Sequence, residues 1–322
     1  MTTKLGSNSI VKKMLGNKEV LKEVLNGVVV YTNTPPVPSY ISFSSPNTFT
    51  IAQAGSKKTW DGSLYYSTDA LHWNTWSGTT TLHSSSTGDT KYLYIRGSGN
   101  TYITGNTSSR YWSVTGSNIT IEGNIENLLD YQDVENNYHP TMGDYAFMYW
   151  LYNNTSIVDC SNLILGTLTL AYNCYNSMFV GCANLTSAPE LPATTLANSC
   201  YNTMFSDCTS LTTAPALPAT SLAYNCYYSM FRGCSSLNTL PALPATTLAD
   251  YCYYEMFRGC SNIKISLTQT GIYQTPYRIP TSGTGTANAQ SSLIGMFRST
   301  GGTFTDNPAI NTTYYTSNNI IY

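Results

Sequence analysis

A 26-residue repeat between about Tyr145 and Asn262 constrains the fold of this chain more than any other feature. One methionine series and two cysteine series keep an interval of 26 residues: Met178, Met204, Met230 and Met256; Cys174, Cys200, Cys226 and Cys252; and Cys182, Cys208, Cys234 and Cys260. A fixed interval of this length indicates one small unit stacked on copies of itself. We therefore expect a solenoid over residues 126–265.

The two halves of each copy have different patterns. Cys226, Met230 and Cys234 are spaced by four, which predicts a short helix with one face turned inward. In the other half, Pro215 and Pro218 exclude a helix and favour an extended segment. A strand and a helix in each copy predict an α/β leucine-rich-repeat solenoid with a C-terminal cap. One copy buries too few apolar side chains to fold alone.

The nine cysteines are interpreted as buried small thiols that fill a narrow core. Eight belong to the repeat, and Cys160 lies just outside its register. Disulfides between neighbouring turns and metal binding are the alternatives.

Three other regions flank the repeats. Residues 1–38 contain a ten-residue repeat and a proline-rich linker. Residues 39–125 alternate short strand-like runs with turns, which predicts an antiparallel, Ig-like β-sandwich. Residues 266–322 are predicted to form a C-terminal loop and cap. The expected fold class is thus α+β with several domains.

The ten-residue repeat of residues 1–31 predicts an anchor. Its short apolar segments are separated by turn residues and cannot bury a core alone. We expect it to pair with copies of itself, with a trimer favoured, or to dock on a larger body. The candidate anchor and oligomerisation residues are Leu5, Ile10, Leu15, Val20, Leu25 and Tyr31.

The composition argues against a partner that binds by charge alone. Charged residues make up 10% of the chain, against roughly 25% in an average protein, and the formal net charge is -2. Nucleic-acid binding needs clustered basic residues, so no nucleic-acid partner is expected. We find no apolar run typical of a secretory signal or a membrane span, so no membrane insertion is expected.

No motif for catalysis or for a cofactor is present. None of the three histidines has metal-ligand spacing, and no nucleophile turn or phosphate-binding glycine loop occurs. We therefore predict no enzymatic activity, catalytic residue, cofactor or metal. Ser67-Thr68-Asp69 with Trp73 resembles the Asp-box turn of sialidases, although strand-turn packing is the stronger interpretation. A loose acidic group is interpreted as a solvated linker rather than a calcium site: Asp130, Asp133, Glu135 and Asp144.

The candidate ligand-binding surface lies at repeat positions that the core does not need. Aromatic and Arg side chains present large, stiff contact areas, and tyrosine can stack on sugars while its hydroxyl stays wet. The alternatives are that these side chains only roof the solenoid or form a subunit contact. The candidate residues are Tyr224, Tyr228, Arg232, Tyr251, Tyr254 and Arg258.

Two stretches resemble known families. The repeat pattern CxxLxxAPxLPxxxLxxxCYxxMFxxC is similar to the BspA-like leucine-rich repeat, and the segments 123–130 and 300–318 fit its gut-Bacteroidales variant. Residues 1–31 resemble the N-terminal stretch of structural and fibre proteins of phages that infect Bacteroides-type bacteria.

Together these resemblances imply a non-enzymatic phage virion protein, such as a head fibre, capsid decoration or tail fibre, on the outer surface of the particle. Residues 1–31 would bind capsid or tail proteins, and the repeats would face host-surface or mucin glycans. A bacterial cell-surface adhesin with the same domains is the alternative.

Overall fold

The computed structural model describes residues 38–301 except residues 56, 167–168, 246, 264–281 and 284–291. Of residues 282–283, and of four strands between residues 3 and 32, it describes the backbone only. The chain forms two compact units, Met1–Pro38 and Ser39–Tyr322.

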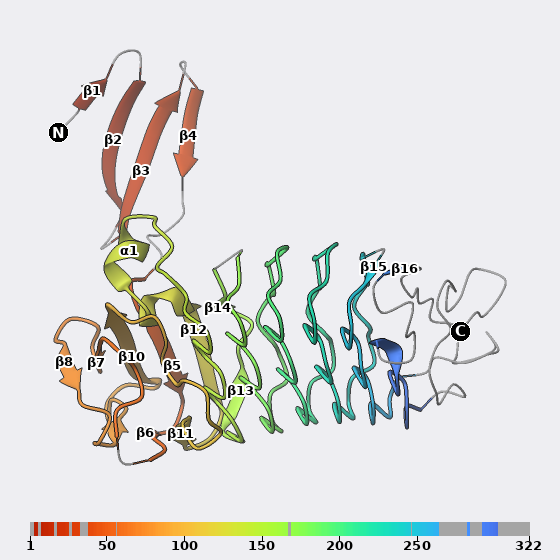
Figure 1. The fold of residues 1–322 in the computed structure, drawn as a ribbon. Helices are drawn as coiled ribbons and strands as arrows, with labels where there is room; N and C mark the ends of the chain where they lie inside the picture. The colour runs from red at the N-terminus through yellow and green to blue at the C-terminus, as the bar shows by residue number, and fades with distance from the viewer. Residues whose placement is uncertain are drawn as a thin grey trace. The chain divides into compact units, whose positions relative to one another are not determined.

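The N-terminal unit contains one antiparallel sheet with its strands in chain order (Figure 1). Its longest pairing joins the second and third strands, from Ser9 opposite Val24 to Leu15 opposite Lys18. The strands are β1 (Thr3–Leu5), β2 (Asn8–Leu15), β3 (Lys18–Leu25) and β4 (Val28–Thr32).

The second unit begins with a β-sandwich. A seven-stranded sheet has the order β13-β12-β5-β10-β7-β8, with β14 also paired to β12, and a three-stranded sheet has the order β11-β6-β9. The strands of the sandwich region are β5 (Ile41–Ser45), β6 (Thr50–Gln53), β7 (Ser63–Ser67), β8 (Asn74–Trp76), β9 (Leu82–His83), β10 (Lys91–Ser98), β11 (Trp112–Thr115) and β12 (Ile119–Asn124). Two strands from the first repeat complete the larger sheet, namely β13 (Ile157–Asp159) and β14 (Leu163–Ile164).

Tryptophans in tilted and edge-on contact fill the sandwich. The ring centroids of Trp60 and Trp76 are 5.0 Å apart, and those of Trp76 and Trp112 are also 5.0 Å apart. Trp112 in turn lies 5.4 Å from Trp150, which belongs to the first repeat. The cores of the sandwich and the repeats are therefore continuous.

The expected α+β class with an α/β solenoid is wrong. In the described part of the chain, the named helices are the 3-10 helix η1 (Ile125–Leu128) and the five-residue α1 (Tyr131–Glu135), which precede the repeats. Two further helical residues, 292 and 293, follow the repeats. The larger sheet is mixed rather than antiparallel, because β13 and β14 pair with β12 in parallel.

The repeats form stacked coils without helices, and we call each 26-residue copy a coil (Figure 1). In residues 173–182, alternate backbone N–H groups have different partners. The N–H groups of Asn176 and Met178 donate to the carbonyl three residues earlier in the same coil, at 3.2 and 3.3 Å. The N–H groups of Tyr175 and Ser177 donate to carbonyls of the next coil, at 3.0 and 2.9 Å. The N–H groups of residues 199–208 alternate in the same way. A run of tight turns thus uses half of its donors internally and half between coils.

Left-handed residues at every fourth position produce these turns. In one coil they are Asn173, Ser177 and Gly181, with φ of 54°, 56° and 72°. An α-helix has negative φ throughout, so the helix predicted from the Cys-Met-Cys spacing cannot form. That spacing of four is the period of the turns, which places the cysteines and methionines on the inner side.

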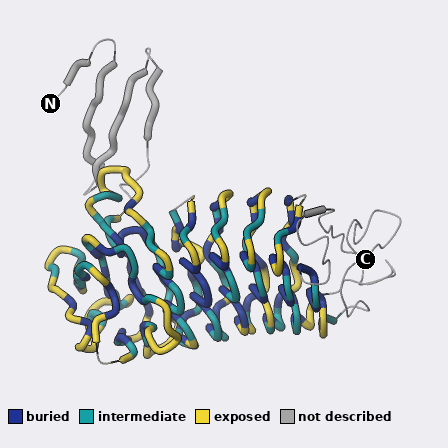
Figure 2. The backbone as a smooth tube through the Cα atoms, in the orientation of Figure 1, coloured by how far each residue is buried: buried dark blue, intermediate teal, exposed yellow. Residues whose placement is uncertain are grey.

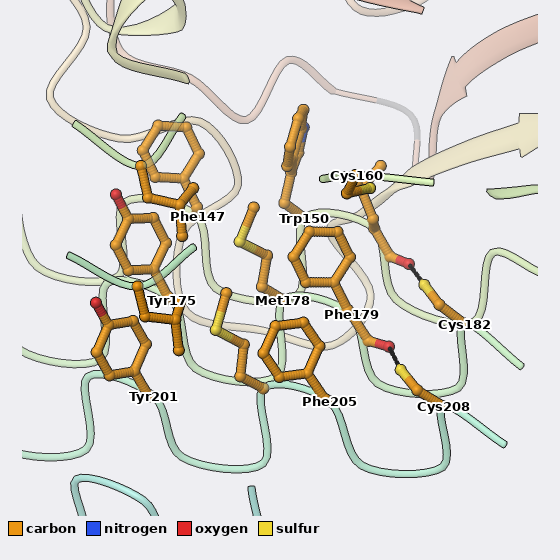
Figure 3. Close-up of a cluster of buried hydrophobic side chains, with 14 of the residues drawn as sticks. Phe147, Trp150, Cys160, Tyr175, Met178, Phe179, Cys182, Tyr201, Phe205 and Cys208 are labelled. Carbon is orange, nitrogen blue, oxygen red and sulfur yellow. Dashed lines mark hydrogen bonds between the residues drawn. The ribbon is translucent and has the colours of Figure 1, made fainter. Parts of the chain in front are cut away.

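Matching side chains of successive coils stack in columns inside the coils (Figure 3). Ring centroids are 5.8 Å apart between Tyr175 and Tyr201, and 5.5 Å apart between Phe179 and Phe205. The tube in Figure 2 shows the buried segments recurring from coil to coil. The expectation of buried cysteines is confirmed, because all nine are buried with free thiols.

The proline-containing half of the coils consists of extended segments. Single parallel bridges join Asp159 to Ser187 and Thr213 to Thr239. Further along, β15 (Thr247–Leu248) pairs in parallel with β16 (Ser282–Gly283).

The sandwich covers the first coil. The backbone carbonyls of Ala146, Met148 and Trp150 accept hydrogen bonds from Ile103 N, Thr104 Oγ1 and Trp112 N, at 2.7, 2.6 and 2.8 Å. At the other end, residues 292–300 continue the stack, since Phe257 N donates to Met296 O at 2.9 Å. Most of the predicted cap at 266–322 lies outside the described residues.

Candidate interaction surface

Four of the predicted site residues form one continuous aromatic group on two successive coils. We call Tyr224, Tyr228, Tyr251 and Tyr254 the tyrosine cluster. Tyr228 and Tyr254 stack with centroids 4.7 Å apart, and Tyr251 lies 5.8 Å from Tyr224 and 5.9 Å from Tyr254. Tyr224 is 46% exposed, so the cluster reaches solvent.

Hydrogen bonds between coils fix the backbone of the cluster. The carbonyls of Tyr224, Tyr228 and Tyr254 accept from N–H groups of the preceding coil at 2.8, 2.8 and 2.7 Å. Earlier coils carry Asn176 and Asn202 at the position of Tyr228, so the core does not require tyrosine there. The cluster is a local addition to a repeated scaffold.

Burial raises the pKa of the Tyr228 phenol, and the neighbouring Tyr254 raises it further. The hydroxyl therefore stays protonated at neutral pH and can donate a hydrogen bond. A stacked pair with available hydroxyls suits a ligand that has both apolar faces and polar groups.

The two predicted arginines share one buried carboxylate. Arg258 Nη1 donates to Glu255 Oε1 at 2.5 Å, whereas Arg232 Nη1 lies 3.8 Å from Glu255 Oε2. The side chain of Arg232 is 50% exposed, against 32% for Arg258. Arg232 is therefore the better placed of the two for a ligand.

The predicted anchor residues all lie in strands of the N-terminal sheet: Leu5 in β1, Ile10 and Leu15 in β2, Val20 and Leu25 in β3, and Tyr31 in β4. Their side chains lie outside the described part of the structure. The proposed contacts of these side chains thus stay a prediction.

The carboxylates noted as possible chemistry have structural roles. Asp69 accepts from the N–H groups of Leu71 and His72 at 2.9 Å each and contacts His72 Nδ1 at 2.7 Å. These hydrogen bonds hold the pKa of Asp69 below its usual range. Asp130 caps α1 by accepting from Gln132 N at 2.9 Å. Among the residues described, no cluster of three His, Cys, Asp or Glu side chains could hold a metal.

A second polar-aromatic group was missed in the sequence. On β10, Tyr92, Tyr94 and Arg96 alternate with the buried Leu93 and Ile95. This alternation indicates an outward strand face, but the rings that surround Arg96 come from other segments, so no local motif reveals the group.

Comparison with protein-family models, curated proteins and solved structures finds no match for this chain. None of the helices described is long and apolar enough to span a membrane. The site must therefore be interpreted from its own geometry.

Proposed function

We propose that this chain is a non-enzymatic display protein of a phage virion, which presents its stacked coils outward to bind host-surface or mucin glycans. The tyrosine cluster is the observation that carries the proposal. It combines exposed aromatic surface with a rigid backbone, so a ligand binds with little loss of conformational freedom.

The division of the coil residues supports binding rather than catalysis. The stacked columns inside the coils account for the repeated aromatic, methionine and cysteine side chains. The side chains that differ from one coil to the next, such as Tyr228 against Asn202, lie at the surface. Recognition of a ligand takes place there. The separate N-terminal sheet and its resemblance to phage fibre proteins support attachment of the chain to a larger body.

The double variant Tyr228→Ala, Tyr254→Ala tests the ligand site. Both side chains are only partly buried, so their loss should weaken glycan binding about tenfold or more while leaving the melting temperature nearly unchanged. Binding is measured on a glycan array and then by titration with the best glycan. Asn202→Ala, at the same position of an earlier coil, is the matched control.

Unchanged affinity of the double variant would contradict the proposed site. Detection of the protein in purified particles would support the virion location, whereas detection on a bacterial surface alone would favour the adhesin.

A further inference from the structure

The outer face of β10 carries an arginine held between two aromatic rings. The guanidinium carbon of Arg96 lies 4.0 Å from the ring centroid of Trp73 and 4.0 Å from that of Tyr131. Trp73 precedes β8, and Tyr131 begins α1, so three separate segments fix the guanidinium. Cation–π attraction to both rings favours this position.

The guanidinium has hydrogen-bonding capacity that the protein leaves unused. Nε of Arg96 is buried without a hydrogen-bond partner. Its two terminal nitrogens do not belong to the buried side-chain atoms that lack a hydrogen-bond partner. Among the described residues, Arg96 forms no ion pair. The positive charge is therefore held in place without a protein anion.

Three tyrosines extend the aromatic surface beside Arg96. Tyr40 and Tyr94 have centroids 4.9 Å apart, and Tyr92 stacks on Tyr94 at 5.5 Å. Tyr40 also lies 5.9 Å from Trp73. We call Tyr40, Trp73, Tyr92, Tyr94, Arg96 and Tyr131 the sandwich face.

Two carboxylates near these tyrosines are already engaged. Asp69 accepts the turn hydrogen bonds given above, and Glu122 Oε1 accepts from Ser42 Oγ at 3.3 Å. Neither forms an ion pair with Arg96. Since both carry negative charge, attraction of an anion depends on direct contact with the Arg96 guanidinium.

We propose that the sandwich face binds a saccharide with an anionic group, either a carboxylate or a sulfate ester. The terminal nitrogens of Arg96 pair with the anionic oxygens, for which a guanidinium has matching geometry. The apolar face of the sugar ring packs on the tyrosines. This site uses other elements than the tyrosine cluster and does not rest on the function proposed for that cluster.

The Arg96→Gln variant of the full chain tests the site on an array that pairs sialylated, uronic-acid and sulfated glycans with their neutral counterparts. The wild-type protein should prefer the acidic members, and Arg96→Gln should weaken that binding at least about tenfold, as expected for a lost charge-assisted pair. Separate carboxylate and sulfate arms identify the anionic group. Arg110→Gln removes the same charge from an exposed arginine and should leave binding unchanged.

Three further measurements test folding, the aromatic surface and the charge. Because Arg96 also contacts Trp73 and Tyr131, near-UV circular dichroism is recorded for each variant. Tyr94→Ala leaves both Arg96 contacts in place and should weaken acidic-glycan binding as well. Raising the salt concentration should weaken wild-type binding more than that of Arg96→Gln.

Equal binding of neutral counterparts, unchanged affinity of a folded Arg96→Gln, or no acidic-glycan binding by the wild type would each overturn the proposal. Loss of binding in the tyrosine-cluster variant with retained acidic-glycan preference would separate the two sites.

Discussion

Residues in the left-handed backbone conformation have an unfavourable conformational free energy that this fold must offset. Several are not glycine, including Thr203 with φ of 51° and Glu255 with φ of 48°. A non-glycine residue in this region costs roughly 1–2 kcal/mol. The coils tolerate that cost because each turn supplies inward side chains and donors to the neighbouring coil.

Gly233→Ala should destabilise the protein by about 2–3 kcal/mol, because the backbone cost and a steric clash add. Gly233 has φ of +76°, and an added Cβ would lie 2.1 Å from Asp207 Oδ1 of the preceding coil. Chemical denaturation measures the change in the free energy of unfolding.

Gly99→Ala separates the backbone cost from the clash. Gly99 also has positive φ, at +63°, but an added Cβ would meet nothing within 4 Å. In an Asp207→Gly background, the cost of Gly233→Ala should fall to that of Gly99→Ala. A cost that stays higher would contradict the assigned clash.

One buried amide adds two side-chain hydrogen bonds to the junction between the sandwich and the first coil. Asn154 Oδ1 accepts from Val114 N at 2.6 Å, and its Nδ2 donates to Trp112 O at 2.6 Å. Asn154 thereby joins β11 to the end of the first coil's turns.

Asn154→Ala should cost about 2–4 kcal/mol, because it leaves a buried donor and a buried acceptor without partners. Thermal and denaturant unfolding measure the loss. Asn162→Ala, which removes an exposed amide of the same coil, is the control. Equal stability of both variants would show that the amide does not hold the junction.

The spacing of Cys226, Met230 and Cys234 predicted which side chains face inward but not the backbone that places them there. Spacing by four is close to the helical period of 3.6, and over two turns the two periods differ little. The left-handed residues that directly precede them decide the conformation, namely Asn225, Ser229 and Gly233. Asn, Ser and Thr at such positions are compatible with several structures, so the pattern alone did not exclude a helix.

The two candidate surfaces differ in how visible they are in the sequence. The tyrosine cluster could be predicted because the 26-residue interval projects its members onto neighbouring coils. The sandwich face could not, because Trp73, Arg96 and Tyr131 become neighbours only through pairing of β10 with β7 and packing of α1.

The division of the chain at Pro38 predicts that its two units have separate roles. A variant lacking residues 1–37 should keep the melting temperature of the second unit, which contains its own continuous core. If the proposed anchor is correct, the same variant should no longer join particles. Calorimetry and particle incorporation are the two measurements.

Replacement of Leu5 and Ile10 by Ser in the full chain provides a milder counterpart to this deletion. Retained incorporation of the shortened chain would contradict the anchor, and a lowered melting temperature would contradict the independence of the second unit.

The buried thiols inside the coils can be used to detect local unfolding of individual coils. Cys182 Sγ donates to Leu151 O of the preceding coil at 3.1 Å, and Cys208 Sγ donates to Phe179 O at 3.2 Å (Figure 3). Burial raises the pKa of the Cys182 thiol to about 12. The thiol is therefore unreactive while its coil stays folded. Pulsed alkylation followed by peptide mapping would thus give the order in which the coils come apart, without any introduced label.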